Sequence, residues 1–318
     1  MIKRFLRPII LEALIKINKN NPKPRYCSLF MTEICNLKCK GCRRSTVEQH
    51  RSNELKLDTI KQLLKSYPGI KSFCIAGQGE PTLCSNFVEI VDYLKSRNKY
   101  VLIVTNGTNT EKFNMLQTKP DRISISLYGY DNQSYLSYCG ANIYERIVEN
   151  FKLLKSKFNN VGFSYIVNRE NYEDLEKIIN FCDNVKPEFL TINNYLAYDP
   201  DNFEETNKII TVNDKEIVNF INNICKNKAY IDAKPEYIDI NKPIFKCSSY
   251  HTTINLDGNG NISCCLSQIP PDADFGNIFN DKNPFNSETI NNLRKQNYVK
   301  NCFAHENCKY CFRNWQGF

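Results

Sequence analysis

Three cysteines with short, fixed spacing are the residues with the clearest chemistry in this sequence. They lie in Cys35-Asn-Leu-Lys-Cys39-Lys-Gly-Cys42, directly after the apolar run from Tyr26 to Met31. Thiolates bind soft metal ions and iron–sulfur clusters. Three are too few for a closed structural zinc site, which takes four ligands. A cubane cluster held by three cysteines leaves one iron open, so the spacing predicts a catalytic cluster that binds a further ligand.

A second group of cysteines lies near the C-terminus. It comprises Cys247, the adjacent pair Cys264 and Cys265, Cys302, Cys308 and Cys311. The whole chain has fifteen cysteines, and an odd number fits a disulfide framework badly. Ligation of metal in a reducing compartment is the alternative, so we expect a cytoplasmic protein.

Polar residues follow or occupy other apolar runs. Gly77-Gln78-Gly79-Glu80-Pro81 comes directly after the run from Ser72 to Ala76. Glycines let backbone approach a ligand closely, and a carboxylate suits an ammonium group. A plain loop with a solvated glutamate is the alternative. Ser124 and Ser126 share one face of an extended strand, where they are either ligand-binding groups or satisfied interior hydroxyls.

The Cys-x3-Cys-x2-Cys motif resembles the signature of the radical S-adenosylmethionine (SAM) superfamily. The resemblance implies that Cys35, Cys39 and Cys42 hold a [4Fe-4S] cluster whose open iron binds SAM. Gly77 to Glu80 then resembles the family's Gly-Gly-Glu element, with Glu80 facing the amino group of SAM. The remaining positions that the resemblance assigns to SAM follow or lie on later strands; they are Asn106, Ser124, Ser126, Ser164, Val167 and Asn193.

This sequence departs from the family pattern at three points. The residue before the third cysteine is usually aromatic in the family and packs near the adenine, but here it is Gly41. Gln78 stands where a glycine is usual. No arginine is clearly placed for the SAM carboxylate, and Arg146 and Arg169 are both candidates.

The C-terminal cysteines resemble the twitch and SPASM appendages of radical SAM enzymes, which bind auxiliary clusters. The resemblance implies one auxiliary [4Fe-4S] cluster; the expected ligands are Cys247, Cys265, Cys308 and Cys311. Adjacent cysteines on a strand point to opposite faces, so Cys264 is the alternative to Cys265. Cys302 can also replace one ligand, and structural zinc is a further alternative.

The other cysteines have no motif of their own. Free cysteine is often a small buried hydrophobe, and we expect most of them to be inert. Cys139 is the exception, because it follows the fourth strand in a loop with Tyr138 and Gly140. Some radical SAM epimerases use a free thiol as hydrogen donor, so Cys139 is a speculative catalytic residue.

The elements that must position these residues alternate in type. We expect strands at 26–31, 72–76, 100–105, 122–127, 161–167 and 189–193, and helices at 58–67, 87–98, 111–117, 144–158, 172–183 and 214–226. Such alternation indicates a parallel sheet with helices outside. Six units are too few for a closed eight-stranded barrel, so the prediction is a partial (β/α)6 barrel of the TIM type over residues 25–228.

The pattern changes after residue 228. Two alternating runs, 250–256 and 261–266, flank the turn Asp257-Gly258-Asn259-Gly260 and predict a β-hairpin. A helix near 287–296 follows, with Ser287 as its N-cap. We therefore expect residues 229–318 to form a small cysteine-rich domain. The helical spacing of apolar residues over 1–24 predicts an amphipathic helix. It would pack on the protein, or dock on a membrane surface or a partner.

The composition excludes several classes of protein. Hydrophobic residues make up 42% and charged residues 24% of the 318, as in ordinary globular domains. No apolar run is long enough to span a membrane, so membrane association is not expected. The net charge of +8 is spread along the chain and does not predict nucleic-acid binding.

The resemblance implies a radical that abstracts hydrogen from a substrate carbon. Oxidation or epimerisation of a sugar or aminocyclitol is the first expectation. Modification of a peptide, by crosslinking, epimerisation or enzyme maturation, is the alternative. A non-catalytic iron–sulfur or zinc scaffold is the third reading. The family also implies an electron donor of the flavodoxin or ferredoxin type.

Overall fold

The alternation of strand and helix predicted from the sequence is present in the computed structural model. It describes residues 22–42, 44, 53–77, 79–197, 199, 201–239, 247–265, 275–296, 308 and 311. The helix predicted over residues 1–24 falls almost entirely outside this set.

The described strands form one sheet that does not close. They are β1 (Tyr26–Phe30), β2 (Ser72–Ala76), β3 (Tyr100–Thr105), β4 (Arg122–Ser126), β5 (Val161–Val167), β6 (Leu190–Asn194), β7 (Ile231–Ala233), β8 (Thr253–Leu256) and β9 (Ile262–Ser263). Their order is β7-β6-β5-β4-β3-β2-β1-β8-β9, and every pair except β8–β9 is parallel. The prediction of a partial barrel is confirmed.

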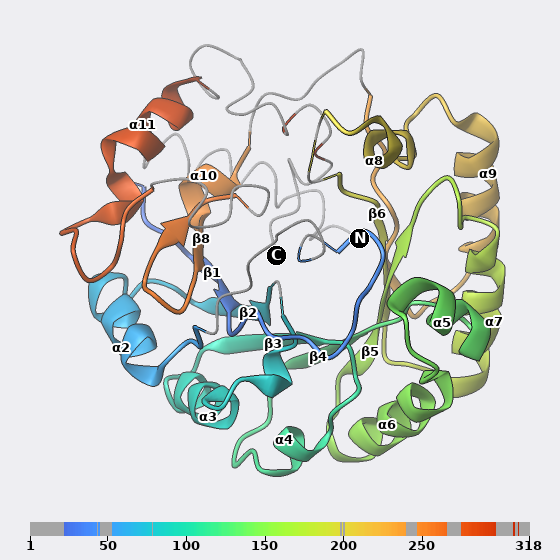
Figure 1. The fold of residues 1–318 in the computed structure, drawn as a ribbon, viewed down its shortest axis with the longest axis horizontal. Helices are drawn as coiled ribbons and strands as arrows, with labels where there is room; N and C mark the ends of the chain where they lie inside the picture. Colours follow the sequence, from blue (N-terminus) through green and yellow to red (C-terminus); the bar gives the residue numbers. More distant parts are fainter. Residues whose placement is uncertain are drawn as a thin grey trace.

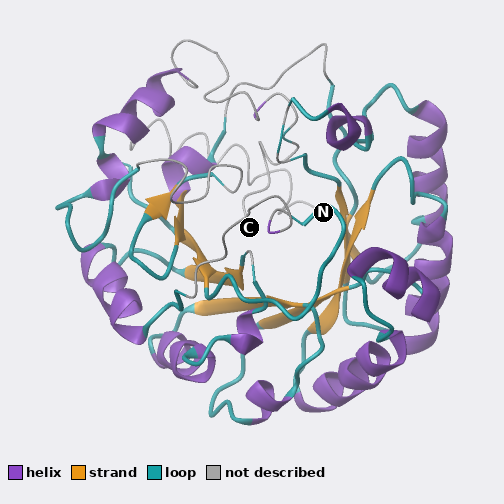
Figure 2. Ribbon diagram, in the orientation of Figure 1, coloured by secondary structure: helices purple, strands orange, loops and turns teal. Residues whose placement is uncertain are grey.

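Helices surround the outside of the curved sheet, as Figures 1 and 2 show. They are α2 (Leu57–Ser66), α3 (Phe87–Ser96), α4 (Glu111–Asn114), α5 (Asn132–Cys139), α6 (Tyr144–Lys157), α7 (Asp174–Val185), α8 (Phe203–Asn207), α9 (Lys215–Ile224), α10 (Ser249–Thr252) and α11 (Glu288–Arg294), with 3-10 turns η2 (Pro81–Leu83) and η3 (Pro284–Asn286). The longer helices bury one apolar stripe against the sheet; Ile60 and Leu63 on α2 are fully buried.

The two faces of the sheet differ in composition. Phe73, Ile75 and Ile103 are buried in the hydrophobic core that the sheet shares with the helices. The alternate positions face the inside of the barrel, because side chains alternate along each strand. On this inner face, Ser126 of β4 is in register with Ser164 of β5, and Ser164 is in register with Thr191 of β6. Small polar side chains therefore share the inner face with larger ones such as Tyr100 and Leu102.

The predicted C-terminal hairpin forms, but it begins later than expected. Residues 249–252 form the helical turn α10 rather than the start of a strand, and the Thr252 hydroxyl donates a 2.9 Å hydrogen bond to the Ser248 carbonyl. The Asp257 side chain fixes the tight turn by accepting from the backbone of Asn259 and Asn261, both at 2.9 Å. Strand β8 then pairs with β1, so the hairpin extends the barrel sheet.

Among the described residues, no helix is long and apolar enough to cross a membrane.

The helix predicted near 287–296 is α11, and the Ser287 hydroxyl accepts from the backbone of Ile290 as its N-cap. The N-cap prediction is confirmed.

Candidate functional site

The segment that leaves the carboxyl end of β1 carries the first three cysteines. We call residues 31–42 the cysteine loop. Cys35, Cys39 and Cys42 are all half-buried there, and none forms a disulfide. The backbone N–H of Cys42 donates to the Cys39 carbonyl at 3.3 Å, which turns the end of the loop. The loop is held by contacts from several strand ends, described next.

The glycines after β2 let the backbone pack tightly against the cysteine loop. A β-carbon added to Gly79 would lie 2.4 Å from the carbonyl oxygens of both Thr32 and Ile34. Gly77 has φ +140°, and a β-carbon there would lie 2.7 Å from the Phe30 ring. No larger residue fits either position, so the glycines are explained by packing against the loop. Gln78, between them, lies outside the described residues.

Glu80 ties this glycine loop to the end of β3. Its side chain is 2% exposed. Oε1 accepts from the backbone and hydroxyl of Thr82 at 3.1 and 2.8 Å and from the Thr105 hydroxyl at 2.7 Å. Oε2 accepts from the backbone N–H of Asn106 at 2.7 Å. Burial raises the pKa of this carboxyl, and the hydrogen bonds oppose that rise.

Asn106 connects the end of β3 to the cysteine loop. Its Nδ2 donates to Oδ1 of Asn36 at 2.9 Å and lies 4.0 Å from Sγ of Cys35. The Asn36 amide in turn donates to the Thr108 hydroxyl at 2.9 Å. The predicted cofactor residues Glu80 and Asn106 are thus brought together beside Cys35.

The carboxyl end of α5 supports the cysteine loop from another side. The backbone N–H groups of Lys38 and Lys40 donate to the carbonyls of Cys139 and Tyr138 at 3.2 and 2.8 Å. Terminal carbonyls of a helix lack partners within the helix, and the loop satisfies these two. The Cys139 thiol is 1% exposed and donates to the Tyr135 carbonyl at 3.0 Å. This buried position does not favour Cys139 as a hydrogen donor to a substrate.

Tyr128 is a residue at this site that sequence reasoning missed. It follows β4 by two residues, and its hydroxyl donates a hydrogen bond to the Cys39 sulfur. Burial raises the pKa of the Cys39 thiol to about 12, and the bond from Tyr128 partly offsets that rise. Ser126 hydrogen-bonds the same phenol. A tyrosine just beyond the Ser124–Ser126 strand was the available signal, but it has no recognisable motif.

Tyr195 reaches the cysteine loop from the end of β6. A β-carbon added to Gly41, which has φ +71°, would lie 3.0 Å from Oη of Tyr195 and 3.1 Å from its ring. Tyr195 is 5% exposed, and its backbone N–H donates to the Val167 carbonyl at 3.0 Å. An aromatic side chain therefore packs at the position where the loop itself has only glycine.

The predicted SAM residues on the strands do not all share one face. Ser124, Ser126, Ser164 and Asn193 occupy alternate positions that line the inner face. Val167 is three residues from Ser164 and lies on the opposite face, where it is fully buried in the hydrophobic core. The structure does not bring Val167 to the inner face.

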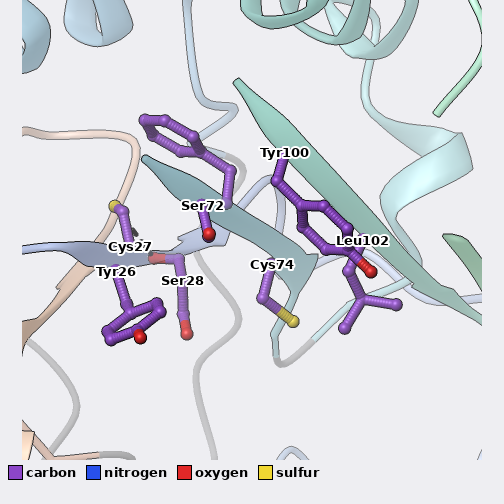
Figure 3. Close-up of a pocket in the computed structure, with 8 residues that line it drawn as sticks. Tyr26, Cys27, Ser28, Ser72, Cys74, Tyr100 and Leu102 are labelled. Carbon is purple, nitrogen blue, oxygen red and sulfur yellow. Dashed lines mark hydrogen bonds between the residues drawn. The ribbon is translucent and has the colours of Figure 1, made fainter. Parts of the chain in front are cut away.

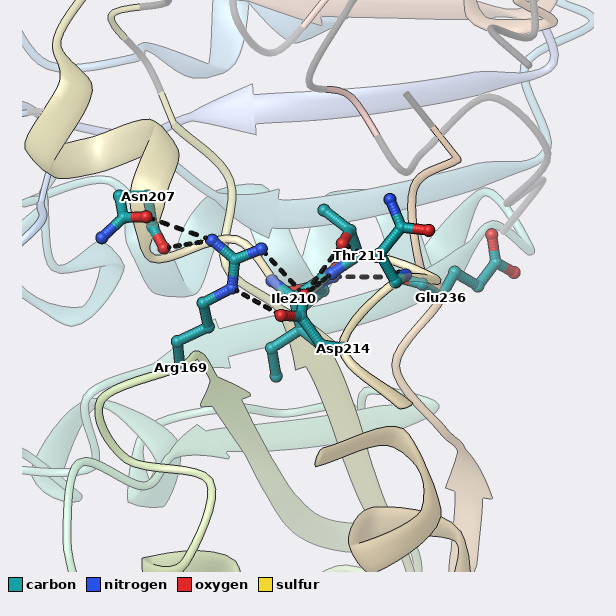
Figure 4. A network of polar contacts seen from close by, with 8 residues as sticks. Arg169, Asn207, Ile210, Thr211, Asp214 and Glu236 are labelled. Atoms are coloured by element: carbon teal, nitrogen blue, oxygen red, sulfur yellow. Dashed lines mark hydrogen bonds and ion pairs between the residues drawn. The ribbon is translucent and has the colours of Figure 1, made fainter. Parts of the chain in front are cut away.

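Neither candidate arginine is available for a ligand carboxylate in this structure. The Arg169 guanidinium pairs with both oxygens of Asp214, at 3.1 and 2.8 Å, and also donates to the carbonyl of Asn207 at 2.8 Å (Figure 4). This network joins the end of β5 to the start of α9. Arg146 is exposed on α6.

A pocket opens on the inner face at the amino-terminal halves of three strands. Figure 3 shows its lining, which includes Tyr26, Ser28, Ser72, Cys74, Tyr100 and Leu102. The cysteine loop leaves the carboxyl end of β1, so this pocket lies at the other end of the strands.

Four of the C-terminal cysteines that the structure describes lie near Tyr250. The thiols of Cys265, Cys308, Cys247 and Cys264, in decreasing order, add to the rise that burial causes in the pKa of Tyr250. Burial and, to a smaller extent, the neighbouring Cys265 raise the pKa of the Cys247 thiol to about 11. Cys264 is fully buried, whereas Cys265 is half-buried. Cys302 lies outside the described residues.

Hydrogen bonds fix the segment after β9 that carries Cys265. The Asn255 amide donates to the Ser263 hydroxyl at 3.0 Å, and that hydroxyl donates to the Cys265 carbonyl at 3.1 Å. Arg294 of α11 donates to the carbonyls of Tyr250 and Phe285, both at 2.7 Å. The backbone N–H of Cys311 donates to the Cys308 carbonyl at 3.3 Å.

Within the described part of the chain, no three His, Cys, Asp or Glu side chains are close enough together to hold one metal ion.

Comparisons with known proteins agree with this site. The profile of the Radical SAM superfamily matches residues 29–182. A probable GTP 3',8-cyclase of Saccharolobus islandicus is 29% identical over 191 residues, which are 58% of this chain and 56% of that protein. A tungsten-containing aldehyde ferredoxin oxidoreductase cofactor-modifying protein of Pyrococcus furiosus is 24% identical over 225 residues, 65% of this chain and 62% of that protein. The chain thus spans little more than half the length of these relatives.

Solved structures share the fold over nearly the whole chain. Streptococcus suis SuiB bound to the precursor peptide SuiA has a TM-score of 0.72 at 16% identity, covering 95% of this chain and 74% of SuiB. BtrN in complex with AdoMet and 2-DOIA has a TM-score of 0.51 at 14% identity, covering 91% of this chain and 92% of BtrN. The profile match includes the cysteine loop and strands β2 to β5, so residues 29–182 form a radical SAM domain.

Proposed function

We propose that this radical SAM enzyme oxidises or epimerises a carbon of a sugar or aminocyclitol. Cys35, Cys39 and Cys42 would hold the [4Fe-4S] cluster, because they are three half-buried thiols on one loop at the barrel mouth. Gly77, Gln78, Gly79, Glu80 and Asn106 would hold the methionine end of SAM. The cluster and SAM together supply a carbon-centred radical that removes a hydrogen atom from the substrate.

The inner face of the sheet is the observation that carries the substrate proposal. Hydroxyl and amide side chains lie on it among apolar ones such as Leu102 and Val104; those from the middle of the strands to their carboxyl ends are Ser124, Ser126, Ser164 and Asn193, which SAM and the substrate would share. Such groups both donate and accept, and a polyhydroxylated substrate offers the matching partners. A site that hydrogen-bonds substrate hydroxyls also rejects analogues that lack them. Ser124, Ser126, Ser164 and Asn193 would contact the ribose and adenine of SAM along the same face.

The C-terminal unit, residues 229–318, would hold one auxiliary cluster. Cys247, Cys265 and Cys308 lie around Tyr250, and Cys311 follows Cys308 by one turn. Cys264 is less suited to ligation, because it is fully buried and burial raises the pKa of its thiol to about 12. An auxiliary cluster of this kind accepts the second electron of an alcohol oxidation.

Peptide modification is the second candidate. Its support is the shared fold with SuiB, whose structure contains a precursor peptide and superposes on 95% of this chain. An electron donor of the flavodoxin or ferredoxin type would serve either reaction. The fifteen thiols suit the reducing cytoplasm, where a thiol-ligated cluster is maintained.

The two candidate functions can be separated by measuring which class of substrate stimulates the cleavage of SAM. The enzyme, reconstituted without oxygen, is mixed with SAM, dithionite and one compound from a sugar, aminocyclitol or peptide panel. We expect 5′-deoxyadenosine to form faster with a sugar or aminocyclitol than with a peptide. When the reacting carbon of the substrate carries deuterium, that deuterium should appear in the 5′-deoxyadenosine. Stimulation by peptides alone would overturn the sugar proposal and support the alternative.

A further inference from the structure

Side chains from two strand ends place hydrogen-bond donors against sulfurs of the cysteine loop. The Asn106 amide approaches Sγ of Cys35 at 4.0 Å, and the Tyr128 hydroxyl donates to the sulfur of Cys39. The Tyr128 contact is the less expected of the two, because 88 residues separate it from Cys39 in the sequence.

The ring of Tyr128 is held by other aromatic residues on α5. It stacks on Tyr138, with ring centroids 5.4 Å apart and planes at 17°, and it meets the edge of Tyr135 at 6.0 Å and 73°. Pairs of this geometry add stability beyond the area that they bury. The phenol therefore has a fixed direction before any ligand binds.

The same helix end also holds the backbone around Cys39. The carbonyls of Tyr138 and Cys139 accept from Lys40 and Lys38, the two residues that flank Cys39. Both the donor ring and the acceptor sulfur are therefore anchored on α5. Contacts with one helix therefore hold both groups in place.

We propose that Tyr128 is a positioning residue that raises the reduction potential of the radical-generating cluster through its hydrogen bond to Cys39. This inference rests on the proposed ligation of the cluster by Cys35, Cys39 and Cys42. Reduction adds one electron, which an external reductant supplies, and so increases the negative charge on the cluster and its sulfurs. A hydrogen bond to a ligand sulfur stabilises the more negative state more strongly, so its loss favours the oxidised form.

The test is a redox titration of Tyr128→Phe, followed by electron paramagnetic resonance. The signal to follow is the one that changes when SAM is added, because that signal belongs to the cluster with the open iron. We expect the equilibrium constant for one-electron reduction of the cluster to fall by up to tenfold. This corresponds to a shift of the reduction potential by about 59 mV toward more negative values. Iron content should equal that of the wild type.

A control in the same aromatic group separates this effect from loss of packing. Tyr144→Phe also removes a phenol hydroxyl, from a ring that packs on Tyr135 and Phe181 rather than on the cysteine loop. Its potential should match that of the wild type. Replacement of Tyr128 by 3-fluorotyrosine keeps the ring and makes the hydroxyl a stronger donor, so the potential should rise.

The outcomes distinguish this inference from the proposed function. An unchanged potential in both Tyr128 variants, with iron retained, would overturn the role of Tyr128 and leave the cluster assignment intact. Loss of iron in Tyr128→Phe with no rise for 3-fluorotyrosine would show that the residue is merely structural. A SAM-sensitive signal that survives in the Cys35→Ala, Cys39→Ala, Cys42→Ala variant would overturn the cluster assignment itself.

Discussion

The Tyr195 ring, carried by the strand end of β6, packs directly on Gly41 in the cysteine loop after β1. A β-carbon on Gly41 would lie 3.0 Å from Oη of Tyr195. Two strands at separate places in the sheet order are thus joined across the barrel mouth at the turn between Cys39 and Cys42. Glycine and tyrosine at these positions form one complementary pair.

We therefore expect Gly41→Ala to weaken the cysteine loop. The backbone there has φ +71°, which costs an alanine about 1–2 kcal/mol, and the new methyl group also meets the Tyr195 hydroxyl. Iron content after reconstitution and the thermal midpoint should both fall. Adding Tyr195→Phe should restore part of the loss, because it removes the 3.0 Å contact and keeps the ring. A double variant no better than Gly41→Ala would show that the pair is not coupled.

Glu80→Gln should destabilise the protein by about 1–3 kcal/mol. An amide keeps one acceptor oxygen but presents an N–H₂ group either to the Asn106 backbone donor or to the Thr82 and Thr105 donors. The midpoint of urea unfolding measures the change. Glu111→Gln, at an exposed position on α4, is the control and should be neutral. Equal stability of the two variants would contradict the role of Glu80 as a link between β2 and β3.

Ser164 and Val167 should respond differently although both are on β5. Ser164→Ala should weaken SAM binding, measured by equilibrium dialysis, and leave stability nearly unchanged. Val167→Ala should lower the free energy of unfolding by about 2 kcal/mol, because the side chain is fully buried in the core. The reverse pattern would place Val167, not Ser164, at the cofactor.

Cys264→Ala and Cys265→Ala form a matched pair in the C-terminal group. Loss of a ligand should remove about four iron atoms from the Cys265 variant. The Cys264 variant should keep its iron and lose only core packing, because its side chain is fully buried. Iron and sulfide assays decide between them. Iron loss confined to Cys264→Ala would reverse the ligand assignment.

His251 should make the protein less stable in acid. Burial, together with the charge of Arg294, lowers its pKa to about 4 from an ordinary value of 6.5. The folded state then binds fewer protons than the unfolded state, so the contribution is complete above pH 6.5 and is lost as the pH falls toward 4. At 1.36 kcal/mol per pKa unit, the loss is at most about 3 kcal/mol. His251→Gln should remove this part of the pH dependence of unfolding; an unchanged profile would contradict it.

The barrel strands could be predicted because their apolar runs are continuous, and three of them have the predicted bounds: β2, β3 and β5. The helix α5 could not be predicted, because half of the positions from Asn132 to Cys139 are polar and its start is set by the capping box of Asp131 and Ser134. Strand β7 has only three residues. The run from Tyr250 alternates between apolar and polar residues as a strand does, but α10 begins at Ser249. The predicted start of the strand at residue 250 is therefore wrong.

The cysteine ligands could be proposed from spacing alone, because a short loop forces its own residues together. The contacts of Tyr128 and Tyr195 could not, because they depend on which strand ends meet the loop. Neighbouring strands such as β3 and β4 are consecutive in the chain, but the pairing of β8 with β1 joins residues about 230 positions apart. No local pattern encodes such a pairing.

That last pairing also determines when the protein can finish folding. On the ribosome, β1 emerges first and acquires β2 soon afterwards, but its other edge has no partner until Thr253 to Leu256 are made. Through most of synthesis, β1 is an open edge strand with unpaired backbone groups, directly beside the three thiols of the cysteine loop. A chain truncated before β8 keeps that edge exposed, and we expect it to aggregate. Iron delivered before β8 docks would thus reach the cysteine loop on an unfinished sheet.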